Sequence, residues 1–96
     1  MILARNLRGI GYELDIVATK GDTLVIVEVK ARLALPGTGR SVEQLLPPTK
    51  RQALRRGAAA FLASQARAFV TIRFDLALVT PTSHGGPAIT YMIDAL

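Results

Sequence analysis

The sequence predicts a single α/β domain whose mixed sheet has about five strands and one main helix. Three observations predict this class. Two adjoining runs of β-branched and aliphatic residues are separated by a Gly-Asp turn signal, apolar residues at helical spacing follow Pro47-Pro48, and two further strand-like runs complete the sequence. Ninety-six residues are enough for one domain at most. The expected order is therefore strand, strand, strand, helix, strand, strand.

The first half of the chain predicts three strands. Residues 2–8 are apolar at the start and basic at the end, which is compatible with a short strand. Residues 12–19 and 23–30 form a hairpin across Gly21-Asp22, with glycine at the first central position, as a type II′ turn requires. Residues 31–39 contain Pro36, Gly37 and Gly39, so we expect a mobile loop there.

The second half predicts one helix and two strands. Pro47-Pro48-Thr49 is a helix start signal, and Leu54, Ala58, Phe61 and Leu62 follow at helical spacing through about Ser64. Residues 69–80 are strand-like, 81–87 form a turn-rich loop, and 88–93 form a final strand.

Composition narrows the chemistry that this chain can perform. It has no cysteine, which removes disulfides, thiolate metal sites and cysteine nucleophiles and fits a reducing cytoplasm. The single His84, in a turn that we expect to be exposed, argues against a histidine-built metal site. No apolar run is long enough to span a membrane. The net charge of +5 suggests a polyanionic partner, and catalysis would rest on carboxylates, lysines and a hard metal ion.

Four charged residues of the predicted hairpin form a patch. The Gly21-Asp22 turn places Asp15 opposite Glu28 and Glu13 opposite Lys30, and strand alternation directs all four to one face. Directly opposed Cβ atoms are about 5 Å apart. Their expected neighbours on that face are Val17, Leu24 and Ile26, and the other face is expected to carry Leu14, Ile16, Val25, Val27 and Val29.

Opposed carboxylates need compensation, because like charges across a ladder are destabilising. Proton sharing, a neighbouring cation or a bound metal would each supply it. Mg²⁺ fits, since it takes one or two carboxylates and binds beside substrate phosphates, and Lys30 beside such an ion would orient or deprotonate a water. Asp, Glu-x-Lys and a divalent ion together describe phosphodiester hydrolysis. The alternative is an ordinary half-exposed sheet face with a Glu13–Lys30 salt bridge.

The helix after Pro47 is basic. Arg51, Arg55 and Arg56 lie away from its apolar stripe, either as a solvated face or as a surface for the phosphate backbone of nucleic acid. Lys50 lies instead on the inward side with Leu54, where it would meet a phosphate near the charged patch. Arg32, just beyond Lys30, is either a phosphate ligand or merely exposed.

Several spaced blocks of the sequence resemble one known family. They are residues 2–6, 12–18, 21–32, 50–56 and 73–79. Together they resemble the bacterial YraN-like family, which is similar to archaeal Holliday junction resolvases and belongs with the restriction-endonuclease-like PD-(D/E)xK nucleases. The resemblance extends from Ile2 to Val79. It implies a restriction-endonuclease-like fold for a single domain over residues 1–96.

The resemblance also implies roles for individual residues. Asp15 corresponds to the first metal-binding aspartate, Glu28 to the second acid and Lys30 to the lysine of the nuclease motif, with Mg²⁺ or Mn²⁺ as cofactor. The backbone carbonyl of Val29 would be a further metal ligand, and Glu13 would either bind the metal or tune Asp15.

The sequence departs from the family pattern at three places. Pro47 stands where members often carry threonine, and Tyr12 stands in place of a glycine. Members also normally begin about two dozen residues earlier, with a helix that contributes a glutamate. We therefore expect an N-terminally truncated domain without that helix.

Two functions are compatible with these features. One is a metal-dependent DNA endonuclease acting on double-stranded DNA that is branched, as in a Holliday junction, or damaged. The other is a catalytically silent nucleic-acid-binding or assembly module. Either would suit a homodimer, because pairing would cover exposed apolar sheet. Asp75, between apolar Phe74 and Leu76, is interpreted as structural.

Overall fold

The computed structural model describes residues 1–31 and 46–96 and contains the predicted elements in the predicted order. The strands are β1 (Ile2–Gly9), β2 (Tyr12–Lys20), β3 (Thr23–Ala31), β4 (Thr71–Thr80) and β5 (Ala88–Met92), and the helix is α2 (Pro48–Ala63). The predicted α/β class is thus confirmed. The largest boundary difference is at β4, which begins at Thr71 rather than Phe69. The loop predicted over residues 31–39 lies outside the described residues, apart from Ala31 at the end of β3.

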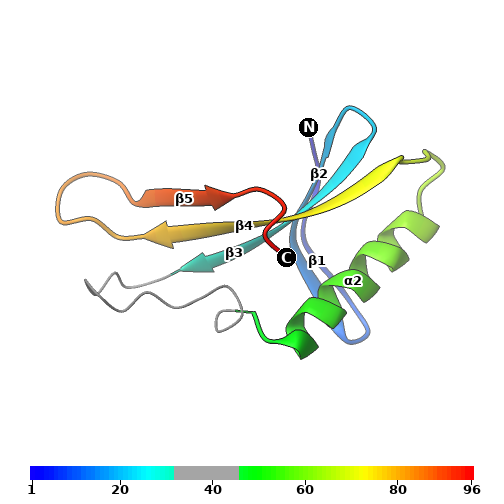
Figure 1. The fold of residues 1–96 in the computed structure, drawn as a ribbon, viewed down its shortest axis with the longest axis horizontal. Helices are drawn as coiled ribbons and strands as arrows, with labels where there is room; N and C mark the ends of the chain where they lie inside the picture. Colours follow the sequence, from blue (N-terminus) through cyan, green and yellow to red (C-terminus); the bar gives the residue numbers. More distant parts are fainter. Residues whose placement is uncertain (32–45) are drawn as a thin grey trace.

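The five strands form one mixed sheet in chain order, β1-β2-β3-β4-β5. All neighbouring strands are antiparallel except β3 and β4, which pair in parallel from Thr23↔Thr71 to Ala31↔Val79. A parallel pair needs a crossover, and α2 lies in the connection between β3 and β4 (Figure 1). The topology therefore brings the start of the helix back near the end of β3.

The β2–β3 hairpin turns as predicted. Lys20 pairs with Thr23 across Gly21-Asp22, and Gly21 has a φ of 58°, the positive value that a type II′ turn needs at its first central position. The predicted register is confirmed from Lys20↔Thr23 to Ile16↔Val27. The pairing ends there, so the ladder does not continue to Asp15 and Glu28.

Leu14 lies on the opposite face of the sheet from the one predicted, so that prediction is wrong. Leu14 is buried in the core under the helix together with Val17, whereas Ile16 packs in a second cluster on the opposite face of the sheet. The in-out alternation of β2 therefore changes phase between Leu14 and Ile16. The partner strand is irregular at the same level, because Asn6 has a φ of 51°. A non-glycine residue rarely adopts this left-handed conformation.

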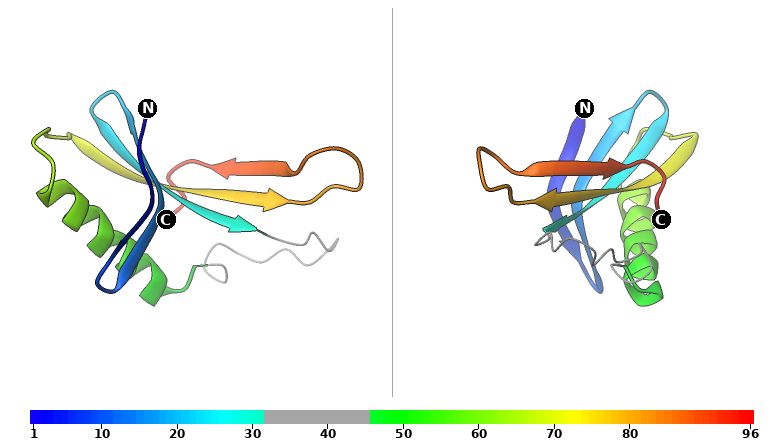
Figure 2. Two further views of the ribbon diagram at one scale, coloured as in Figure 1. Left: turned by 180° about the vertical axis from the view of Figure 1, so that it is seen from behind. Right: turned by 60° about the vertical axis from the view of Figure 1, so that its left-hand side comes forward.

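Helix α2 packs on one face of the sheet and buries Leu54, Gly57, Ala58 and Phe61 (Figure 2). Lys50 and Leu54 lie one turn apart on this inward side, as the spacing predicted. At Gly57 the helix approaches β2 so closely that a Cβ would lie 2.7 Å from the Tyr12 ring and 2.8 Å from the Leu14 side chain. Within the described ranges, no helix is long and apolar enough to cross a membrane.

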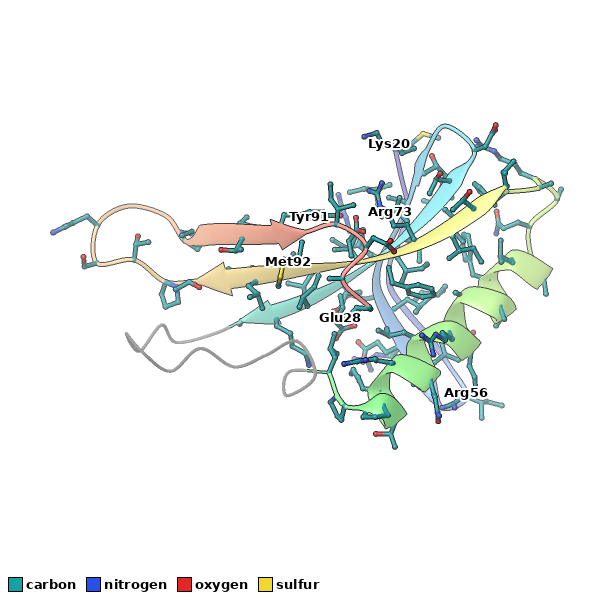
Figure 3. The ribbon with its side chains drawn as sticks, in the orientation of Figure 1. Lys20, Glu28, Arg56, Arg73, Tyr91 and Met92 are labelled. Atoms are coloured by element: carbon teal, nitrogen blue, oxygen red, sulfur yellow. The ribbon has the colours of Figure 1, made fainter. Side chains whose placement is uncertain are left out.

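Asp75 of β4 is fully buried and joins β4 to β5 and to the C-terminal residues. Its carboxylate accepts hydrogen bonds from Arg73 at 3.0 Å, from the Tyr91 hydroxyl at 2.5 Å and from the Asp94 N–H at 2.8 Å. Figure 3 shows Arg73 and Tyr91 beside each other where β4 and β5 meet. Every oxygen of the buried carboxylate thus has partners, and Asp75 has the structural role that the sequence predicted.

The same contacts set the ionisation of Asp75 and Tyr91. Burial by itself would raise the pKa of Asp75, but the hydrogen bonds from Arg73, the Asp94 N–H and Tyr91 outweigh it, so the pKa lies below its ordinary value. Burial, the hydrogen bond to Asp75 and the charge of Asp75 raise the pKa of Tyr91 to about 12. The phenol therefore remains a donor throughout the physiological range.

We predict that Gly57→Ala destabilises the protein. In an ordinary helix interior this change stabilises by up to about 1 kcal/mol, whereas here the added methyl group overlaps Tyr12 and Leu14, and overpacking costs about 1–3 kcal/mol. Urea unfolding followed by circular dichroism measures the difference. Ala59→Gly, at an exposed position of the same helix, is the matched control and should lose about 1 kcal/mol from propensity alone. A Gly57→Ala protein more stable than wild type would contradict the close approach.

We also predict that Tyr91→Phe lowers the free energy of unfolding by about 1–2 kcal/mol. The ring still packs, but the Asp75 carboxylate loses a hydrogen bond to a charged acceptor. Tyr12→Phe is the control, because it removes the same hydroxyl from a half-buried tyrosine that is not among the partners of Asp75. Equal stability of the two variants in urea would show that the Tyr91 hydroxyl contributes nothing.

Candidate functional site

Glu28 is the centre of the candidate site. It is on β3, on the same face as Leu24 and Ile26 of the helix-side core, and only 3 % of its surface is exposed. Figure 3 shows Glu28 directed from β3 toward the first turn of α2. A charged carboxylate at such a position needs charged or hydrogen-bonding partners, because burial of an unpaired charge is costly.

Two lysines approach the same oxygen of Glu28. Lys30 Nζ lies 3.7 Å from Glu28 Oε1, and Lys50 Nζ lies 3.8 Å from it. Lys30 comes from the same strand, two residues further on, whereas Lys50 comes from the first turn of α2. The other oxygen, Glu28 Oε2, is buried without a hydrogen-bond partner in the described part of the chain. One oxygen thus faces two cations, and the other remains available as a ligand.

Asp15 completes the cluster by an interaction that strand pairing alone did not predict. Its Oδ2 accepts a hydrogen bond of 2.8 Å from the backbone N–H of Val29. The β2–β3 ladder stops at Ile16↔Val27, and the Asp15 carboxylate takes the position that a backbone carbonyl would occupy in a continued ladder. Asp15 is thereby fixed against the end of β3, next to Glu28. We call Asp15, Glu28, Lys30 and Lys50 the carboxylate–lysine cluster.

The cluster shifts the ionisation of Glu28. Burial raises the pKa of Glu28 above its ordinary value, and the negative charge of Asp15 raises it further. The positive charges of Lys50 and Lys30 act in the opposite direction but do not cancel the increase. A perturbed carboxyl group with specific charged neighbours is typical of functional sites.

Glu13 is not part of the cluster, so the predicted two-by-two patch is wrong. Glu13 pairs with Arg8 of β1, and Arg8 Nε lies 3.4 Å from Glu13 Oε1. The physical reason is the change of phase in β2. Tyr12 and Leu14 pack on the helix side, which directs Glu13 to the opposite face. A Glu13–Lys30 salt bridge is replaced by contacts of Lys30 and Lys50 with Glu28.

The basic residues of α2 separate into different environments. Lys50 points inward to Glu28, as its helical position predicted. Arg51 is half-buried and donates from Nε to the Leu46 carbonyl at 2.9 Å, and Arg56 donates to the Gly11 carbonyl at 3.0 Å. Arg55 is exposed. Arg51 and Arg56 therefore also connect the helix to neighbouring backbone, which helical spacing alone could not indicate.

Arg32 and Val29 are the remaining residues of the predicted site. Arg32 lies outside the described residues. Val29 contributes its N–H to Asp15, while the use of its carbonyl as a metal ligand stays a prediction.

Two contacts were not predicted from the sequence. They are the contact of Lys50 with Glu28 and the hydrogen bond of Tyr91 to Asp75. The only available signal for the second was a carboxylate within an apolar strand.

The carboxylate content of the site is limited. Within residues 1–31 and 46–96, no group of three or more His, Cys, Asp or Glu side chains is arranged to hold a metal ion. The cluster offers two carboxylates, Asp15 and Glu28. This number suits an ion that completes its coordination with water and phosphate oxygens, such as Mg²⁺, better than one enclosed by protein ligands.

Comparison with known proteins gives consistent matches along the chain. The model of the uncharacterised protein family UPF0102 matches residues 1–79, which include the whole carboxylate–lysine cluster. A UPF0102 protein of Geobacter sulfurreducens is 39% identical over 95 residues, which cover 98% of this chain and 72% of the relative.

Two further relatives give similar values. A UPF0102 protein of Methylocella silvestris is 42% identical over 81 residues, covering 83% of this chain and 62% of the relative. A UPF0102 protein of Acidothermus cellulolyticus is 38% identical over 101 residues, which cover 95% of this chain and 75% of the relative. The chain thus spans between 62% and 75% of the length of these relatives.

We predict that Glu28→Gln stabilises the metal-free protein at neutral pH. A carboxyl group whose folded pKa is raised contributes stability that is present below its unfolded pKa and lost as the pH rises through the folded pKa. Glutamine stands in for the protonated acid, so the variant should melt at a higher temperature than wild type at pH 7, with EDTA present. The difference should shrink as the pH falls through the raised pKa of Glu28 in the folded protein and should be at its smallest below about 4.5, the ordinary value for glutamate. A variant that melts lower at pH 7 would show that the two lysines outweigh burial.

Proposed function

The chain belongs to the uncharacterised protein family UPF0102, and from its carboxylate–lysine cluster we propose that it is a divalent-metal-dependent DNA endonuclease of the PD-(D/E)xK type. The observation that carries the proposal is the environment of Glu28. This buried carboxylate has two ammonium groups beside one oxygen, an unpartnered second oxygen and the Asp15 carboxylate next to it.

The donor set fits Mg²⁺ or Mn²⁺. Asp15 and Glu28 would hold the ion, since hard divalent cations prefer carboxylate oxygens and Glu28 Oε2 has no competing hydrogen bond among the described residues. A divalent ion supplies charge neutralisation at the scissile phosphate and makes water a better nucleophile at neutral pH. Asp15 is held in place by the Val29 N–H, so its carboxylate is oriented before any ion binds.

Lys30 would assist the attack on phosphorus. Its ammonium group is held 3.7 Å from Glu28 Oε1, and about a third of its side chain is exposed. From this position it can donate a hydrogen bond to an attacking water and offset the negative charge that develops on the phosphate. The strand backbone fixes the spacing between Glu28 and Lys30, because residues two apart lie on one face.

The substrate would be DNA. A net charge of +5 and the basic residues of α2 provide sequence-independent affinity for the phosphate backbone, with Arg55 exposed and Arg51 and Arg56 nearby. The resemblance to junction resolvases makes branched or damaged duplexes the first substrates to test. The absence of cysteine is compatible with a cytoplasmic site of action.

A second candidate function is a catalytically silent nucleic-acid-binding or assembly module. The small number of carboxylates at the site favours it, because the carboxylate–lysine cluster contains two and the described residues include no group of three or more side chains arranged to hold a metal ion. Pairing of two copies would suit either function. Dimerisation stays a prediction. It is supported by the exposed Ile89, Tyr91 and Ile93 around β5, which form apolar surface that a second copy would cover.

The experiment is a cleavage assay on linear, flapped and four-way-junction DNA with Mg²⁺ or Mn²⁺. We expect metal-dependent cleavage that falls by at least about a hundredfold in Glu28→Gln and Lys30→Met, the loss typical when one group acting on the transition state is removed. Asp22→Asn, in the exposed hairpin turn, is the matched acid-to-amide control. Glu13→Gln should also retain activity, because Glu13 is paired with Arg8.

Cleavage that survives Glu28→Gln would contradict the proposed site. Binding that weakens steeply with salt, without cleavage of any substrate, would instead support the silent module. In that case neutralising Arg55 should reduce DNA affinity and Lys30→Met should leave it unchanged.

A further inference from the structure

Lys50 occupies an unusual position for a lysine. It is in the first turn of α2, where the helix dipole is positive and a cation is normally unfavourable. The first turn has no acidic residue and Pro47 provides no side-chain cap, so nothing within the turn offsets the charge. The compensating contact is across the helix–sheet gap, where Lys50 Nζ lies 3.8 Å from Glu28 Oε1.

The charges of the cluster balance with Lys50 included. Asp15 and Glu28 contribute two negative charges, and Lys30 and Lys50 contribute two positive charges, for a sum of zero. A divalent ion at Asp15 and Glu28 would leave the same groups with an excess of two positive charges. Two ammonium groups and a divalent cation within a few ångströms of one carboxylate repel each other strongly, because the site is partly shielded from water.

The two lysines differ in their freedom to leave. Lys30 is on β3, whose backbone pairs with β4 at Lys30↔Leu78, and its side chain is on the same face as Glu28, two residues away. Lys50 reaches Glu28 from the helix, and 41 % of its side chain is exposed to solvent. Lys50 is therefore the cation that can rotate away from Glu28 into solvent or toward a bound anion.

We propose that Lys50 and a divalent metal ion compete for Glu28, so that metal binding releases Lys50 to contact a DNA phosphate. This inference rests on the proposed metal site and adds to it an order of events and a coupling. Because the lysine is released at the N-terminal end of α2, the phosphate would meet a cation where the helix dipole already favours an anion. Metal and DNA then promote each other's binding, as linkage requires.

The first test measures Mn²⁺ binding without DNA, by electron paramagnetic resonance of the free ion. Lys50→Met should bind Mn²⁺ about tenfold more tightly than wild type, because one repelling charge has been removed. Lys50→Arg keeps the charge and should bind as wild type does. Arg55→Met is the matched control on the same helix. It loses the same charge from an exposed position away from Glu28, and its Mn²⁺ affinity should change little.

The second test measures the coupling. A fluorescent 20-base-pair duplex is titrated with protein in two buffers. One contains Ca²⁺, chosen so that DNA is bound without being cleaved, and the other contains EDTA. Ca²⁺ should strengthen DNA binding of the wild type more than that of Lys50→Met, in which no lysine is released. The inference would be overturned if the ratio of DNA affinity in Ca²⁺ to DNA affinity in EDTA were the same in wild type and Lys50→Met. It would also be overturned if Lys50→Met bound Mn²⁺ no more tightly than wild type.

The outcomes separate this inference from the proposed function. If wild type binds Mn²⁺ and Glu28→Gln does not, the proposed metal site is supported. The Mn²⁺ affinity of Lys50→Met then tests only the competition. If neither wild type nor Lys50→Met binds Mn²⁺, both the proposed metal site and the competition are overturned. Thermal melting of each variant without metal shows that it is folded before either titration is interpreted.

Discussion

The burial of the Glu28 carboxylate is the interaction on which the candidate site depends. A carboxylate with 3 % exposure at the end of an apolar run is costly unless other groups stabilise its charge, and Lys30 and Lys50 supply that stabilisation at one oxygen only. The remaining oxygen is unpartnered among the described residues, and the negative charge of Asp15 opposes the ionisation of Glu28. The site is therefore stabilised incompletely by the protein itself, which is the condition under which a bound cation adds stability.

The fold brings these groups together through three separate elements. The β3 strand carries Glu28 and Lys30 at fixed spacing, and the end of the β2–β3 ladder frees Asp15 to bond the Val29 N–H. The crossover helix returns to the same end of β3 and adds Lys50. The close approach at Gly57 and the Asp75 network keep the helix and β5 in place around them. The groups that form the cluster are thus distinct from the groups that hold the sheet together.

The sequence was informative wherever a local rule decides the geometry. Glycine at position 21 determined the turn and hence the pairs from Lys20↔Thr23 to Ile16↔Val27, and helical spacing placed Lys50 on the inward side. Glu13 lies on the other face than a continuous alternation along β2 predicts, because the alternation changes phase between Leu14 and Ile16. The phase change near Asp15 accompanies a left-handed Asn6, and asparagine signals only weakly that it will adopt this conformation. The partners of Lys50 and Tyr91 depend on crossover and pairing geometry between distant segments, which no local pattern contains.

The central claim is that Asp15 and Glu28 together hold a divalent ion. Crystals of the protein soaked in Mn²⁺ and measured at a wavelength with strong manganese anomalous scattering test it most directly. The account predicts one strong anomalous peak within coordination distance of both carboxylates, at about 2.2 Å, and no such peak in Glu28→Gln. A peak elsewhere on the molecule, or none between Asp15 and Glu28 at a saturating concentration of Mn²⁺, would contradict it.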